Sequence, residues 1–212
     1  MNKINNKLKL IEHPLVRRDL TIIRDKNTST EIFREAVKRI SNILAAEVSA
    51  DFETIQIEIE TPLEKTNGYK LLHDVVLVPV LRAGLGMVNG FLELIPDAKV
   101  GHIGLQRNEE TLEPVEYYYK TPKNINDSMV ILLDPMLATG GSASEAINYL
   151  KQRSASTIIF ACIVAAPEGV LKLQYDHPDI KIFAAALDRK LNNKGYILPG
   201  LGDAGDRTFG TL

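Results

Sequence analysis

The sequence predicts an α/β protein with a central, mostly parallel sheet flanked by helices. Two observations support this fold class. The first is a set of continuous apolar runs, typical of strands covered on both faces, at 75–80, 129–133, 157–166 and 180–187. The second is amphipathic sequence between those runs, at 142–153 and 167–175. Alternating strands and helices predict parallel strands joined by right-handed crossovers.

The region before the first apolar run predicts a helix followed by a strand. Thr28 and Glu31 have the spacing of a capping box, and apolar residues recur at helical spacing from Ile32 to Ile43. Residues 51–62 then alternate apolar and polar side chains, which predicts a strand with one face in water. We therefore expect an N-terminal helical segment ahead of the core sheet.

Length and composition favour one domain spanning residues 1–212. The chain is 45% hydrophobic, which is enough to bury a core, and no repeat with a period of about 20 to 50 residues is present. Its 25 basic and 27 acidic side chains leave a net charge of -2, so no overall field favours nucleic acid or an anionic bilayer. No apolar run approaches the ~20 residues of a membrane span, and we expect a soluble, cytoplasmic protein that binds neither membrane nor nucleic acid.

Cysteine and histidine usage argues against a metal centre built by the protein. Cys162 is the only cysteine and lies within an apolar run, which predicts core packing and excludes an intramolecular disulfide or a cysteine cluster. The histidines are scattered along the sequence, and we expect surface or packing roles for His13, His73, His102 and His177.

Two segments follow buried strands, where α/β sheets bind their ligands. Segment 81–87 follows the first run and segment 134–142 follows the second. Neither carries a familiar nucleotide motif. The glycines of the first, Gly84 and Gly86 with Gly90 beyond, miss the dinucleotide spacing by one residue, and the second lacks the Gly-Lys-Ser/Thr of a Walker loop.

Segment 134–142, DPMLATGGS, nevertheless predicts a phosphate cradle. Backbone N–H groups from Ala138 to Ser142 can converge there, because glycine permits unusual dihedrals and close approach. The helix that begins near Ser142 adds its positive end. At the strand end, the Asp134 carboxylate could accept two hydrogen bonds from vicinal hydroxyls, so together these features predict a ribose 5-phosphate site. The alternative is that Asp134 caps a local turn before Pro135.

Several segments together resemble the uracil phosphoribosyltransferases, within the type I phosphoribosyltransferase superfamily. These segments are EHPLV at 12–16, VPVLRAGLGM at 78–87, RNEETLEPV at 107–115, LLDPMLATGGS at 132–142 and GYILPGLGDAGDRTFGT at 195–211. The resemblance implies the type I phosphoribosyltransferase fold with a β-arm, and a base-binding hood formed by the N- and C-terminal segments. The superfamily's sugar motif usually has two adjacent acids, whereas Asp134 precedes Pro135 as in the uracil enzymes. This difference argues against direct metal ligation by the loop.

The resemblance implies transfer of phosphoribose from 5-phospho-α-D-ribose 1-diphosphate (PRPP) to N1 of uracil, giving UMP and diphosphate. It assigns catalytic roles to Asp134, Asp203 and Arg107. It assigns PRPP binding to Arg82, Arg107, Asp134, Pro135, Met136, Leu137, Ala138, Thr139, Gly140, Gly141, Ser142 and Asp203. It assigns uracil binding to Ile197, Gly202, Asp203 and Ala204.

The chemistry of this reaction fits the residue types. The sugar gains oxocarbenium character as the diphosphate leaves, so positioned cations are needed around the leaving group. Arg82 and Arg107 offer guanidinium forks that match phosphate oxygens. The ordinary alternatives are a salt bridge at the start of a helix for Arg82 and a solvated surface residue for Arg107.

Uracil would be recognised by main-chain groups that cannot exchange donor and acceptor roles, which discriminates against cytosine. The glycines of PGLGDAG at 199–205 would let that chain approach the ring. By resemblance Asp203 contacts the donor, and we expect it to offset positive charge on the sugar. Action as a base toward N1–H is an alternative role, and a simple turn is the structural alternative.

Partners and cofactors follow from the same resemblance. Mg²⁺ is the implied cofactor, held mainly by substrate oxygens, with no metal ligands from the protein itself. GTP is a candidate effector, and a homo-oligomer, either a dimer or a tetramer, is implied. Within 106–120, the spacing of Tyr117 and Tyr119 predicts a strand, which either packs on another subunit or forms an ordinary sheet edge. The charged residues that precede it could close over the diphosphate.

Two other functions fit the sequence less well. A regulator that senses phosphoribosylated pyrimidines and binds RNA would need a basic patch with interleaved aromatic residues, which the sequence does not display. A phosphoribosyltransferase for another base is the alternative among enzymes, and a panel of nucleobases distinguishes it.

Overall fold

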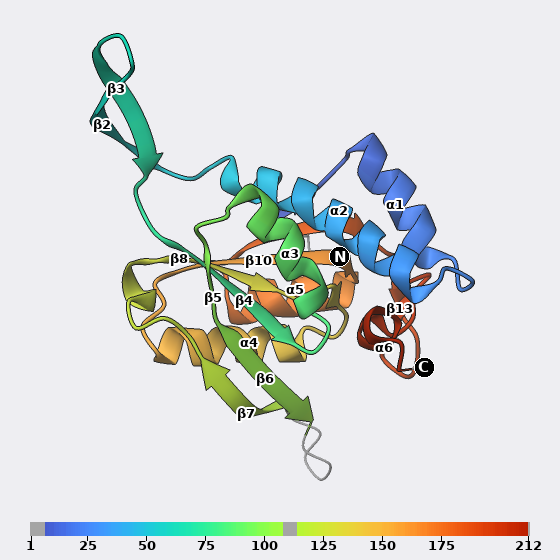
Figure 1. Ribbon diagram of the computed structural model, residues 1–212. Helices are drawn as coiled ribbons and strands as arrows, with labels where there is room; N and C mark the ends of the chain where they lie inside the picture. The colour runs from blue at the N-terminus through green and yellow to red at the C-terminus, as the bar shows by residue number, and fades with distance from the viewer. Residues whose placement is uncertain (1–6, 108–113, 212) are drawn as a thin grey trace.

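The computed structural model describes residues 7–107 and 114–211. Its main sheet has the path β1-β11-β10-β8-β4-β6-β7, and all neighbours along the path are parallel except β6 and β7 (Figure 1). The four apolar runs form its centre, as β4 (Val75–Leu81), β8 (Met129–Leu133), β10 (Thr157–Ala165) and β11 (Lys181–Leu187). The edges and short additions are β1 (Leu8–Leu10), β5 (Lys99–Val100), β6 (His102–Arg107), β7 (Pro114–Lys120) and β9 (Met136–Leu137). The predicted mostly parallel sheet is confirmed.

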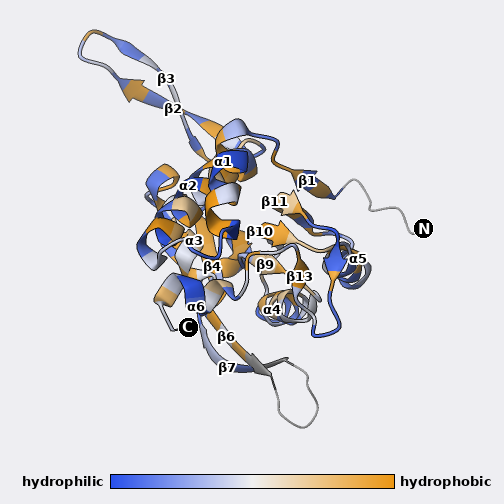
Figure 2. Ribbon diagram, turned by 90° about the vertical axis from the view of Figure 1, so that its right-hand side faces the viewer, coloured by the Kyte–Doolittle hydropathy of each residue, from blue (hydrophilic) through white to orange (hydrophobic). Residues whose placement is uncertain are grey.

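Helices cover both faces of this sheet (Figure 1). One face carries α1 (Pro14–Arg24), α2 (Thr30–Ser49) and α3 (Leu85–Leu94). The other carries α4 (Gly141–Gln152) and α5 (Pro167–Asp176). In β4, Leu77 faces the first layer while Val76 and Val78 face the second, which explains why the strand is apolar throughout (Figure 2). Cys162 is fully buried in β10, as predicted.

The predicted capping box at the start of α2 is wrong by one residue. Ser29 is the N-cap, and its side chain accepts a hydrogen bond from the Ile32 amide at 3.4 Å. The Thr28 hydroxyl instead donates to the Ile22 carbonyl at 2.6 Å. Thr28 therefore stabilises the turn between α1 and α2, and Ser29 caps α2.

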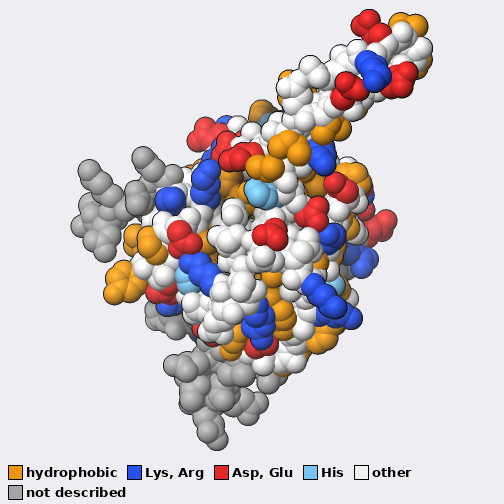
Figure 3. Space-filling model, turned by 90° about the vertical axis from the view of Figure 1, so that its left-hand side faces the viewer, with side chains coloured by type: hydrophobic (Ala, Val, Ile, Leu, Met, Phe, Trp, Pro, Cys, Tyr) orange, Lys and Arg blue, Asp and Glu red, His pale blue; other side chains and the backbone are white. Residues whose placement is uncertain are grey.

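A hairpin of β2 (Thr54–Glu60) and β3 (Lys65–Leu71) projects away from the sheet (Figures 1 and 3). The strand was correctly predicted, but the expectation of one buried face is wrong: nearly every β2 side chain is exposed. Within the described residues β2 pairs with β3 and with no other strand, and most side chains on both strands are exposed. Leu63, at the turn, is 95% exposed.

The C-terminal segment lies against the turn between α1 and α2. It contains β12 (Lys190–Leu191), β13 (Ile197–Leu198) and α6 (Ala204–Phe209). Elsewhere in the chain, the 3-10 helix η1 (Ile125–Asp127) precedes β8. The Arg207 guanidinium donates to the carbonyls of Ile23 and Asp25, which joins the two ends of the chain. In the described part of the chain, no helix is both long and apolar enough to cross a membrane.

Candidate active site

Three loops meet at the carboxyl edge of the central strands. A Cβ added to Gly84, after β4, would lie 2.3 Å from the Leu133 carbonyl oxygen at the end of β8. A Cβ on Gly195, before β13, would lie 3.7 Å from Cγ2 of Thr139. The loop after β4, the loop after β8 and the C-terminal segment are therefore in close contact, where α/β sheets bind ligands.

The segment expected to hold phosphate forms a turn that leads directly into α4. Gly140 is the N-cap of α4 and has φ of +82°, a conformation that favours glycine. The first helical bond joins the Ser144 amide to the Gly140 carbonyl at 2.9 Å, and the Thr139 hydroxyl accepts from the Gly141 amide at 3.5 Å. The first N–H groups of a helix have no partner within it, so this turn presents donors and the positive helix end at the sheet edge.

The floor of this turn is the first turn of α5, which the sequence did not indicate. A Cβ on Gly169 would lie 2.4 Å from the Ala138 carbonyl oxygen and 2.8 Å from that of Leu137. The Ala166 amide also donates to the Leu137 carbonyl at 2.8 Å. Glycine at 169 is thus required by close backbone approach, and its only signal in the sequence is a glycine inside a predicted helix.

Asp134 directly follows β8 and is half-buried. Burial raises the pKa of this carboxyl to about 7, although a hydrogen bond from the Met136 amide, at 3.1 Å, favours the charged form. The turn-capping role considered from the sequence is therefore present in the structure. It leaves Asp134 Oδ2 without a partner among the described residues. Donors from a ligand would favour the ionised form.

Arg82 follows β4 after a cis peptide bond with Leu81 and is paired with the C-terminal helix. Its Nη2 donates to Oδ1 of Asp206 at 3.0 Å, and its guanidinium lies 6.0 Å from the centre of the Phe209 ring. Hydrogen bonds from Thr211 and then from Arg82 lower the pKa of Asp206. Ion pairs this exposed contribute little to stability, so Arg82 can exchange Asp206 for an anionic ligand at small cost.

The main chain of Arg107 ends β6 and pairs with Pro114. The side chain of Arg107 lies outside the described part of the chain, as do residues 108–113, which include most of the segment expected to close over the diphosphate. Tyr117 and Tyr119 lie on β7, which pairs with β6, so the predicted strand is confirmed. On this strand, Tyr119 stacks on the Arg153 guanidinium at 3.9 Å.

The expected base-binding segment is a loop between β13 and α6 with special backbone geometry. The Leu198–Pro199 peptide bond is cis, and Gly200 and Gly202 have φ of +64° and +81°. Asp203 is the N-cap of α6, with Oδ1 accepting from the Asp206 amide at 2.9 Å. Of the other residues expected here, Ile197 and Ala204 are buried.

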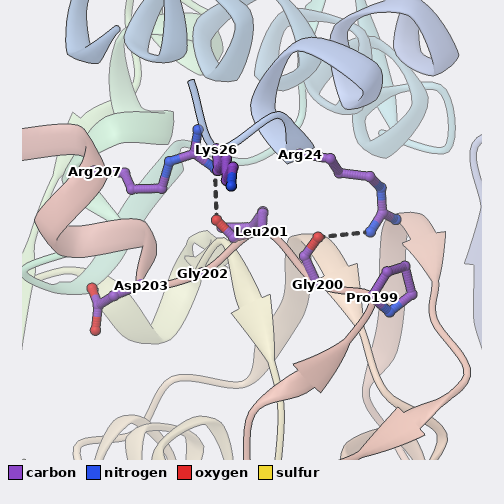
Figure 4. Close-up of a pocket in the computed structure, with 8 residues that line it drawn as sticks. All are labelled: Arg24, Lys26, Pro199, Gly200, Leu201, Gly202, Asp203 and Arg207. Carbon is purple, nitrogen blue, oxygen red and sulfur yellow. Dashed lines mark hydrogen bonds between the residues drawn. The ribbon is translucent and has the colours of Figure 1, made fainter. Parts of the chain in front are cut away.

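A cavity of about 270 Å³ opens beside this loop (Figure 4). Its lining joins the α1–α2 turn to the C-terminal segment and consists of Arg24, Lys26, Pro199, Gly200, Leu201, Gly202, Asp203 and Arg207. Sequence reasoning included Gly202 and Asp203 but missed the basic residues. Arg24 and Lys26 lie far along the chain from the loop, and no local pattern marks them. Arg207 lies within the C-terminal segment itself, but its contacts with the turn after α1 cannot be read from the sequence.

Asp203 and Arg82 are brought together around Gly205. A Cβ on Gly205 would lie 3.2 Å from Asp203 Oδ1 and 3.9 Å from Arg82 Nη2. No group of three or more His, Cys, Asp or Glu side chains that could bind a metal is found in residues 7–107 and 114–211. A metal ion that keeps much of its water and binds through substrate phosphates, as Mg²⁺ does, needs no such cluster, and a single carboxylate such as Asp203 could contact it through water.

The fold is that of the phosphoribosyltransferases. A hypoxanthine-guanine phosphoribosyltransferase from Bacillus anthracis superposes with a TM-score of 0.51 over 75% of this chain and 80% of that one, at 13% identity, a likeness of fold alone. The AQ2163 protein from Aquifex aeolicus superposes with a TM-score of 0.90 over 95% of this chain and 97% of that one, at 37% identity.

The sequence comparisons define the family. The family model for uracil phosphoribosyltransferase matches residues 10–211. Proteins named uracil phosphoribosyltransferase from Acholeplasma laidlawii and Bacillus cytotoxicus are 56% and 57% identical over 205 and 210 residues, each match covering 97% of this chain and 99% of the relative. The chain belongs to the uracil phosphoribosyltransferase family.

Proposed function

We propose that this protein transfers phosphoribose from PRPP to N1 of uracil, giving UMP and diphosphate, a reaction of pyrimidine salvage. The observation that carries the proposal is the meeting of three loops at one sheet edge: the turn before α4, the Arg82 loop and the C-terminal segment. Family membership supports the same reaction. The catalytic unit is proposed to be one domain, residues 1–212, with its two ends forming the hood over the base.

The phosphate of the donor is proposed to lie on the turn from Ala138 to Ser142. The backbone N–H groups and the positive end of α4 complement a phosphomonoester dianion. Asp134 would accept hydrogen bonds from the ribose hydroxyls through its unpaired Oδ2. Because those donors favour the charged carboxylate, donor binding lowers the pKa of Asp134 from about 7.

The diphosphate is proposed to bind Arg82 and Arg107. Arg82 then leaves Asp206 for the stronger, paired interaction that a guanidinium makes with phosphate oxygens. As the bond from C1 to diphosphate breaks, these cations stabilise the negative charge that develops on the leaving group. The electron pair of uracil N1 forms the new bond to C1, the electrons of the C1–O bond leave with the diphosphate, and the N1 proton passes to solvent water.

The base is proposed to lie against the main chain of Ile197, Gly202 and Ala204. Asp203 lies beside Arg82 near Gly205, which suits a carboxylate that faces the sugar and offsets its positive charge. A mismatched buried polar group costs about 1–3 kcal/mol, so two mismatches against cytosine would give strong selection for uracil.

Mg²⁺ is the proposed cofactor. When bound, it neutralises charge on the diphosphate, and Asp203 would contact it through water. GTP is proposed as an effector, tested by comparing initial rates with and without it. A cytoplasmic location is proposed because a multiply charged sugar phosphate does not cross membranes unaided.

A homo-oligomer, a dimer or tetramer, is proposed on the basis of the projecting hairpin. Isolated two-stranded hairpins are marginally stable in water, and β2 is exposed along nearly its whole length. Ile55, Ile59 and Tyr69 are exposed on it. Contact with a second subunit would cover these side chains, and sedimentation of the intact protein measures the assembly.

The test is incubation of the protein with PRPP, Mg²⁺ and each nucleobase in turn, followed by separation of nucleotides. The proposal expects UMP as the main product and no comparable product with the other bases. Formation of another nucleotide in preference would assign a different base. Salt-dependent retention of RNA without UMP formation would favour the regulatory alternative instead.

A further inference from the structure

An ion pair outside the expected base-binding residues bonds both polar backbone groups of Gly200. The Arg24 guanidinium makes a paired contact with Asp188, with Nη1 to Oδ2 at 2.9 Å and Nη2 to Oδ1 at 2.7 Å. Nη1 of Arg24 also donates to the Gly200 carbonyl at 2.9 Å. Figure 4 shows this hydrogen bond from Arg24 to the Gly200 carbonyl. Oδ2 of Asp188 in turn accepts a hydrogen bond from the Gly200 amide at 2.9 Å.

This ion pair is well placed to hold its geometry. Asp188 is buried and Arg24 is partly buried, so water competes little for the charged hydrogen bonds. Gly200 has φ of +64°, and a Cβ there would lie 2.2 Å from the Ile197 carbonyl oxygen. The backbone at this point is therefore fixed by close packing and by charged hydrogen bonds on both of its polar groups.

Arg207 fixes the next residue in a similar way. Its Nη1 donates to the Leu201 carbonyl at 2.7 Å, while other contacts bind it to the turn after α1. Gly202 follows, and no hydrogen bond joins its N–H or C=O to any other residue in the described ranges. The loop thus has two constrained residues followed by one whose polar groups are available to a ligand.

We propose that Arg24 and Asp188 are positioning residues that set uracil affinity by fixing Gly200, and through it the orientation of Gly202. The inference rests on the proposed placement of uracil at Gly202. The proposed effect of both side chains is transmitted through the main chain of the loop and does not require contact with the base. A fixed backbone is what lets its N–H and C=O groups reject a base of the wrong hydrogen-bonding pattern.

The test compares steady-state kinetics of Arg24→Lys and Asp188→Asn with wild type. Lysine keeps the charge but lacks the planar fork needed to bond both carboxylate oxygens and the Gly200 carbonyl. Asparagine keeps an acceptor for the Gly200 amide but loses the charge that holds Arg24. Arg17→Lys is the matched control, since Arg17 lies on the same helix, is 70% exposed and meets Glu12 only at 3.7 Å.

Loss of a charged hydrogen bond changes an equilibrium by about tenfold or more, so each variant should raise KM for uracil by about tenfold. KM for PRPP should stay at the wild-type value, and the ratio of uracil to cytosine use should fall. Because both residues act on Gly200, the double variant should raise KM for uracil no more than the single variant with the larger effect does. Arg17→Lys should match wild type.

The inference is overturned if folded Arg24→Lys or Asp188→Asn retains the wild-type KM for uracil, or if both substrates are weakened equally. If Arg24→Lys fails to fold, KM for uracil in Asp188→Asn alone decides whether the positioning role holds. Gly202→Val separates this inference from the proposed base site. A raised KM for uracil in Gly202→Val with unchanged positioning variants would refute only the positioning role, whereas an unchanged Gly202→Val would refute both.

Discussion

Asp134→Asn should stabilise the ligand-free protein at alkaline pH while removing most of its activity. The pKa of this carboxyl rises from an ordinary 3.8 to about 7, because burial disfavours its charge. This rise corresponds to about 4 kcal/mol between the two protonation states. Asparagine resembles the protonated form and can still accept the hydrogen bond from the Met136 amide.

The sign of the pH dependence follows from proton binding. Between about pH 4 and pH 7 the folded protein holds the Asp134 proton and the unfolded chain releases it, so the free energy of unfolding falls as pH rises. Asparagine does not titrate and escapes this loss. The stability advantage of Asp134→Asn should therefore be near zero at about pH 4 and reach about 2 to 4 kcal/mol by pH 8.

Urea denaturation at fixed protein concentration measures this difference at both pH values. Asp97→Asn, a change at an exposed carboxylate, is the matched control and should show no such pH-dependent gain. UMP formation by Asp134→Asn should fall by about a hundredfold, since hydrogen bonds from the ribose hydroxyls to a charged acceptor are lost. If the stability difference between Asp134→Asn and wild type does not change with pH, burial does not raise the pKa of Asp134. If turnover is unchanged, Asp134 does not contact the sugar.

Two further substitutions test the donor site. Gly169→Ala should raise KM for PRPP, because the new Cβ would lie 2.4 Å from the Ala138 carbonyl oxygen and must displace the turn that holds the phosphate. If the folded variant keeps the wild-type KM for PRPP, α5 does not support the phosphate site. Arg107→Ala should weaken the use of PRPP and affect uracil less, and an equal loss for both substrates, measured by initial rates, would argue against a role at the diphosphate.

The central strands were predictable because helices cover both faces of the sheet, which makes β4 and β8 apolar at almost every position. The turn at Gly140 was predictable for a local reason: its positive φ and the helix that follows are recorded in neighbouring residues. Arg24 and Asp188 were not predictable, since 164 positions separate them and the contact arises only when the chain ends meet.

The exposed hairpin shows a different limit of pattern analysis. Alternation in 51–62 correctly indicated a strand, but the pattern cannot specify which surface covers the apolar side chains. In the described chain Ile55 and Ile59 remain exposed. An alternating pattern therefore predicts local conformation more reliably than burial, because burial depends on partners elsewhere in the chain or in another subunit.

A crystal structure with UMP and Mg²⁺ would test the central claim most directly, because one ligand carries the phosphate, the ribose diol and the base. The account predicts the phosphate within hydrogen-bonding distance of the amides from Thr139 to Gly141, the diol on Asp134, and the base beside Gly202. Density for the phosphate away from that turn, or a diol that does not contact Asp134, would contradict it.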